Sequence, residues 1–65
     1  MQWKGDLMLE KLRNQKSMNS VRKILREKGI QFTEPYENFI KFEYDGVRYT
    51  MQRRTYPSVH MVILN

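Results

Sequence analysis

The chain has 65 residues, a formal net charge of +5, no cysteine and a single histidine. This length allows one small domain over residues 1–65, and the lack of cysteine excludes a disulfide-stapled scaffold. Because small domains often depend on a disulfide, a metal or a partner, the expected stabiliser here is a partner chain. The composition favours a cytoplasmic location. No apolar run approaches the roughly 20 residues that cross a bilayer, and the N-terminus lacks the apolar stretch of a signal peptide.

The N-terminal segment, residues 1–17, contains a short apolar stripe after Asp6, a residue type that caps helices. The stripe consists of Met8, Leu9 and Leu12. If residues 6–28 formed one helix, this stripe and the next would point to nearly opposite sides, at about 100° per residue. We therefore expect a break within NQKSMNS, which is rich in weak helix formers. Residues 1–17 then form a short helix or fold back, and the role of Trp3 stays open.

A second amphipathic helix is predicted to follow. Its apolar stripe consists of Met18, Val21, Ile24 and Leu25. Ser20 or Asn19 can cap its N-terminus, because both side chains can accept a hydrogen bond from a free backbone N–H. Gly29 supplies the expected stop, since glycine readily adopts the left-handed conformation that ends many helices.

The segment FIKFEYDGVRYTMQRR, residues 39–54, predicts a β-hairpin, preceded by extended chain in IQFTEP. Asp45-Gly46 can adopt the two positive φ angles of a type I′ turn, whose twist matches the strands that it joins. This turn fixes the register and separates the two faces. The predicted pairs are Tyr44–Val47, Phe42–Tyr49 and Ile40–Met51 on an apolar face, and Glu43–Arg48 and Lys41–Thr50 on the other.

A third strand is predicted in VHMVILN, after a connection that contains Pro57. Its alternation places Val59, Met61 and Ile63 on one face and His60, Val62 and Leu64 on the other. Two apolar residues on the second face predict burial on both sides. We expect an α+β domain with one or two N-terminal helices packed on a three-stranded antiparallel meander in residues 18–65. The predicted core is Leu9, Leu12, Val21, Ile24, Leu25, Ile40, Phe42, Tyr44, Val47, Tyr49, Met51, Met61 and Ile63.

Catalytic and metal chemistry are not predicted. His60 lies in an apolar strand, with no serine or cysteine nucleophile in a pattern that would recruit it. The seven carboxylates are scattered without the spacing of metal ligands, and the three glycines are isolated. We therefore expect a protein that is not an enzyme, with no catalytic residue, metal, cofactor or small-molecule substrate.

The excess positive charge lies in residues 1–28, which hold eight Lys/Arg and three acids, whereas residues 29–65 hold four of each. A solvated helix face accounts for this distribution, although an acidic partner such as nucleic acid is compatible with it. The residues that would contact phosphates are Arg22, Lys23, Arg26, Arg53 and Arg54. Phe42, Tyr44 and Tyr49 are expected on the core face, which leaves them unable to form a stacking platform.

The segment VRKILREKGIQFTEPYENFIKFEYDGVRYTM, followed by PSVHMVILN, resembles the front part of YbjN-like proteins, which are similar in fold to type III secretion chaperones. This resemblance implies a non-catalytic, chaperone-like role. The element order also resembles HicA-like toxins, small RNA-cleaving domains of the double-stranded-RNA-binding type. Those proteins carry a glycine-serine-histidine segment before the hairpin turn, where this chain reads ENFIKF, so we expect RNA binding at most.

The leading functional hypothesis is a small protein-interaction module that self-associates or binds another protein. Its interface is predicted at His60, Val62 and Leu64, because an edge strand without lysine or proline is a template for strand addition. The alternative is a basic nucleic-acid-binding module that uses the five arginine and lysine residues named above. A monomer is expected instead if the N-terminal segment covers the second sheet face with Trp3, Leu7 or Met8.

Overall fold

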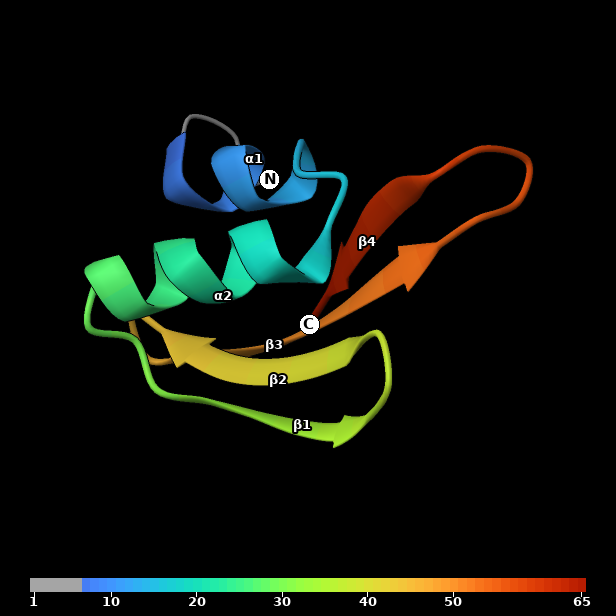
Figure 1. Ribbon diagram of the computed structural model, residues 1–65. Coiled ribbons are helices and arrows are strands. Elements are labelled where there is room, and N and C mark those ends of the chain that lie inside the picture. Colours follow the sequence, from blue (N-terminus) through green and yellow to red (C-terminus); the bar gives the residue numbers. More distant parts are fainter. Residues whose placement is uncertain (1–6) are drawn as a thin grey trace.

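The computed structural model describes residues 7–65. Its elements are α1 (Leu7–Arg13), α2 (Met18–Glu27), β1 (Phe32–Tyr36), β2 (Phe39–Tyr44), β3 (Val47–Arg54) and β4 (His60–Leu64). The strands form one antiparallel sheet in the order β1-β2-β3-β4. Both helices lie on the same side of this sheet (Figure 1). The α+β class is confirmed, whereas the predicted three-stranded meander is wrong because the sheet has four strands.

The additional strand is β1, which forms from the segment that was expected only to be extended. It pairs with β2 through Phe32–Phe42, and its register shifts before the pair Tyr36–Phe39. The connecting turn contains no glycine, but Asn38 adopts a φ of 61°, a conformation that asparagine tolerates better than most residues. A hairpin turn without the usual glycine explains why the sequence pattern did not predict this strand.

The break between the helices falls within the predicted segment, because α1 ends at Arg13 and α2 begins at Met18. The predicted caps of α2 at Ser20 or Asn19 are wrong. Ser17 is the N-cap, and its Oγ accepts a hydrogen bond from the backbone N–H of Ser20 at 3.2 Å. The predicted stop is confirmed, since Gly29 follows the end of α2 with a φ of 71°. The proposed cap at Asp6 lies outside the described residues.

The β2–β3 hairpin has the predicted register in full. Asp45 and Gly46 have φ angles of 55° and 77°, as a type I′ turn requires. Phe42 stacks on Tyr49, with ring centroids 5.4 Å apart, and both side chains are buried against the helices. The turn therefore assigns each residue of the hairpin to one face of the sheet.

The core lies between the helices and the sheet and joins all the predicted helix positions to the middle of β2 and β3. Three predicted members are less buried than expected: Val47 is 37% exposed, and Tyr44 and Ile63 are only partly buried. Val47 and Tyr44 flank the hairpin turn, at the end of their strands. Met8 and Met18, which were not assigned to the core, are buried in it.

Candidate interaction surface

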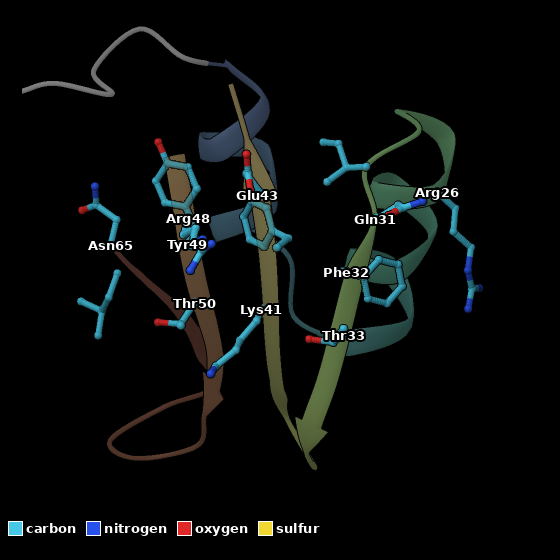
Figure 2. Close-up of a pocket in the computed structure, with 13 residues that line it drawn as sticks. Arg26, Gln31, Phe32, Thr33, Lys41, Glu43, Arg48, Tyr49, Thr50 and Asn65 are labelled. Atoms are coloured by element: carbon cyan, nitrogen blue, oxygen red, sulfur yellow. The ribbon is translucent and has the colours of Figure 1, made fainter. Parts of the chain in front are cut away.

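The sheet has an outer face, opposite the helices, on which none of the described side chains is fully buried. The register and the strand alternation place on it Thr33, Tyr36, Phe39, Lys41, Glu43, Arg48, Thr50, Gln52, Arg54, His60, Val62 and Leu64. Figure 2 shows the middle of this face, where Thr33, Lys41 and Thr50 lie on three neighbouring strands. Apolar, aromatic and charged side chains therefore share one accessible surface.

The predicted interface residues form one row on the outer face of β4. Leu64 is 54% exposed, and His60 and Val62 are partly exposed. The Nδ1 atom of His60 lies 2.6 Å from the carbonyl oxygen of Ser58, which acts as the acceptor when Nδ1 carries the proton. The sequence predicted that both faces of this strand are buried, but no described segment covers its outer face. Two apolar side chains are left as contact area for a partner.

The expectation that N-terminal residues cover this face is wrong for the residues that the structure describes. Leu7 is exposed on α1, and Met8 is buried in the core on the helix side of the sheet. α1 packs against β4 from that same side. Trp3, the third proposed cover, lies outside the described residues.

The two edges of the sheet differ in how open they are to another strand. Among the strands of residues 7–65, β4 pairs only with β3, and none of its residues is a proline, a lysine or an acid. β1 carries Pro35 and an irregular register between Thr33 and Tyr36, and both features hinder strand addition. β4 is therefore the edge that is suited to pairing with another chain.

Glu34 on β1 binds α2 through a two-pronged ion pair. Arg22 donates from Nε and Nη2 to the two carboxylate oxygens at 2.7 and 2.8 Å. Its Nη1 donates to Oδ1 of Asn19 at 2.6 Å. The hydrogen bonds and charge of Arg22 hold the pKa of Glu34 below its usual value, and the same bonds raise the pKa of Arg22.

The predicted phosphate-binding residues do not form a single cluster. Arg26 lies over the ring of Phe32, 5.8 Å from its centroid, and Lys23 is exposed elsewhere on α2. Arg22 and Arg53 line a small hollow together. Arg54 is not among the residues that line it. Arg22 and Arg53 therefore lie near each other, whereas Lys23, Arg26 and Arg54 lie outside this hollow.

A second hollow, here called the aromatic–arginine hollow, lies at the β1–β2 turn. It is lined by Tyr36, Glu37, Asn38, Phe39, Gln52, Arg53 and Arg54. Tyr36 and Phe39 meet edge to face, with centroids 5.8 Å apart and planes at 87°. Sequence reasoning missed this aromatic pair because β1 was not expected. The position of Phe39 on the face opposite the core could be predicted from the register of the hairpin alone.

A wider, open hollow extends along β1, β2 and β3 (Figure 2). Its lining includes Arg26 and Phe32 near the helix and Lys41, Thr50 and Leu64 on the outer face. Because residues from both sides of the sheet line it, the hollow is a surface depression that runs around the strands and is not an enclosed pocket. It offers contact area to a macromolecule rather than an enclosed volume.

Comparisons with known protein families, curated proteins and solved structures found no match. The resemblances to YbjN-like proteins and HicA-like toxins therefore stay predictions. Among residues 7–65, no three His, Asp or Glu side chains gather closely enough to hold a metal ion. Within the same range, each helix is too short or too polar to cross a membrane.

Proposed function

We propose that this domain is a non-enzymatic protein-interaction module that pairs with a second protein chain through β4 and the adjoining outer face. The observation that carries the proposal is the position of Val62 and Leu64 on an open edge strand, with Leu64 54% exposed. Burial of apolar surface contributes roughly 25 cal/mol per Å², so covering these side chains would stabilise a complex. A chaperone-like role would use the same surface.

The backbone of β4, in addition to its side chains, favours pairing with another strand. An edge strand presents unpaired N–H and C=O groups that an added strand can satisfy. β4 is His60–Leu64, and it contains no proline, lysine, arginine or acid. The other edge has both features that β4 lacks: Pro35 and the ionised Glu34. The asymmetry favours β4 as the binding edge.

A second copy of the chain is the partner that we favour. In an antiparallel pair of β4 strands centred on Val62, each Val62 would meet its copy. His60 would then lie opposite Leu64, so no like charges would face each other. A small domain with a limited core gains stability from such a partner. The cysteine-free sequence supports a cytoplasmic setting for this complex.

Light scattering over a wide range of protein concentration tests the proposal. We expect a dimer at high concentration and a monomer for Val62→Lys at the same concentration, because two lysines would face each other at the centre of the pair. Thr33→Lys is the matched control: it adds the same charge to the outer face at the opposite edge strand and should leave the dimer intact. Far-UV circular dichroism checks that both variants fold. A wild-type monomer at every concentration would overturn self-association.

The alternative use of the α2 cations for nucleic-acid binding has less support. Arg22 is engaged with Glu34 and Asn19, and Arg26 lies over Phe32. Breaking these contacts to reach phosphates would offset part of the gain in binding. Lys23 and Arg26 are the exposed cations of the predicted helix set, and Arg26 is the one that lies over an aromatic ring.

A further inference from the structure

We propose that the aromatic–arginine hollow binds single-stranded nucleic acid, with a base on the Tyr36–Phe39 pair and a phosphate beside Arg54 and Arg53. This binding site lies within one chain at the β1–β2 turn, and it adjoins the β4 edge because Gln52 and Arg54 are the cross-strand partners of Val62 and His60. Nucleic-acid binding would therefore be an additional function of the outer face.

The aromatic pair provides the surface on which a base can stack. Tyr36 is 71% exposed, so its ring is accessible to a ligand. The edge-to-face contact with Phe39 supports the tyrosine ring from one side. Every base has a π-face, so stacking of this kind accepts many sequences.

The two arginines bring positive charge to the same hollow from the end of β3. The Nη2 atom of Arg54 donates to Oε1 of Gln52 at 3.0 Å, which directs its guanidinium along the outer face. The backbone N–H of Arg53 donates to the carbonyl oxygen of Asn38 at 3.1 Å, so β3 is tied to the aromatic turn. Its Nε donates to the carbonyl oxygen of Lys16 at 2.9 Å.

The balance of charge in the hollow favours an anionic ligand. Its lining residues include two arginines, Arg53 and Arg54, and one acid, Glu37. Farther along the outer face, Lys41 adds a cation, while Glu43 and Arg48 are cross-strand partners of opposite charge. A ligand with both a planar ring and a phosphate satisfies the two halves of the hollow at once.

A single strand fits this arrangement better than a duplex. Bases in a duplex are stacked on one another, so an exposed ring cannot reach their faces, whereas an unpaired base can leave the stack. An acidic peptide would satisfy the arginines but would leave the exposed aromatic pair without a stacking partner. We therefore commit to single-stranded RNA or DNA and use the other ligands as test arms.

Fluorescence anisotropy with a labelled oligouridine of about ten nucleotides, within the usual range of single-strand site sizes, measures this binding. Two phosphate contacts predict that affinity falls about sevenfold between about 50 and about 200 mM salt, from a slope of about −0.7 per contact. Tyr36→Ala should weaken binding about tenfold through lost stacking, whereas Tyr36→Phe, which keeps the aromatic ring, should bind as the wild type does. Tyr56→Ala is the matched control, because Tyr56 is 86% exposed but lies outside the hollow.

Two further comparisons test which arginine contacts the phosphate and which class of ligand the hollow binds. Arg54→Gln should weaken binding and reduce its salt dependence, whereas Arg26→Gln on α2 should leave both unchanged. Equal losses for Tyr36→Ala and Tyr56→Ala, or a loss for Arg26→Gln alone, would overturn the site. Tighter binding of duplex RNA or of a polyglutamate peptide would overturn the ligand class. Val62→Lys should still bind the oligonucleotide, so failure of the dimer and failure of this site can be told apart.

Discussion

The two faces of the sheet show how neighbouring residues on one strand take on different tasks. On β3, Met51 points toward the helices and is fully buried, whereas Gln52 belongs to the outer face and is only partly buried. The helix side joins side chains from both helices and from β2, β3 and β4 into one core. The outer face is not covered by any described segment, so stability is concentrated on one side and binding capacity on the other.

The largest expected effect compares these two faces directly. Met51→Ala removes a fully buried side chain and should lower the free energy of unfolding by about 2–5 kcal/mol. Gln52→Ala, one residue away on the outer face, should change it by no more than about 0.5 kcal/mol. Urea unfolding followed by circular dichroism measures both variants. Similar losses at the two positions would show that the outer face is structurally covered after all.

The second-largest effect on stability is expected at the Asp45-Gly46 turn, which assigns the residues of the hairpin to the two faces. Gly46 has a φ of 77°, and a Cβ added there would contact no atom within 4 Å. Gly46→Ala should therefore destabilise the fold by about 1–2 kcal/mol through backbone strain alone. Gly46→Asn should cost less, because asparagine tolerates this conformation better. Thermal unfolding ranks the variants, and an equal loss for both would contradict the strain argument.

The next prediction concerns the N-cap of α2, the helix that helps to cover the inner face of the sheet. Ser17 Oγ accepts a hydrogen bond from the N–H of Ser20, so Ser17→Ala should cost about 1 kcal/mol. Ser17→Asp, which keeps an acceptor at the cap, should retain most of the stability. Chemical unfolding of the three proteins decides the point, and a loss for Ser17→Asp as large as that for Ser17→Ala would argue against capping.

The inner face was easier to predict from the sequence than the outer one. Helical spacing in Val21, Ile24 and Leu25 and the Asp45-Gly46 turn act locally, so the core and the hairpin register could be worked out from short segments. β1 could not, because its turn has a positive φ at Asn38 without glycine and its strand contains Pro35.

The predicted part of the candidate surface is the row on β4, whose alternation is visible in the sequence. The unpredicted part is the aromatic–arginine hollow, which requires β1 to place Tyr36 beside Phe39. It also requires the register to bring the end of β3 alongside the β1–β2 turn. Such a site depends on the contact of segments that are separate in sequence, and periodicity within one segment does not reveal it.

The smallest expected effect concerns the ion pair that fastens β1 to α2 at the border of the inner face. The pKa of Glu34 is lowered in the folded state by Arg22, so the carboxylate contributes stability above its unfolded pKa of about 4.3. That contribution is lost as pH falls through the lower, folded pKa. The side chains are 27% and 29% exposed, so at neutral pH we expect no more than about 1 kcal/mol.

Urea unfolding at neutral pH and at about pH 3, roughly a unit below the unfolded pKa of glutamate, isolates this contribution. Glu34→Gln should be less stable than the wild type at neutral pH, and the difference should shrink at the lower pH because the wild-type carboxylate becomes protonated. Arg22 stays charged throughout, since its pKa is raised. Glu37→Gln removes the same charge from the neighbouring turn and serves as the control. A difference between Glu34→Gln and the wild type that does not depend on pH would assign the effect to packing, and the ion pair would then contribute nothing to the cover of the inner face.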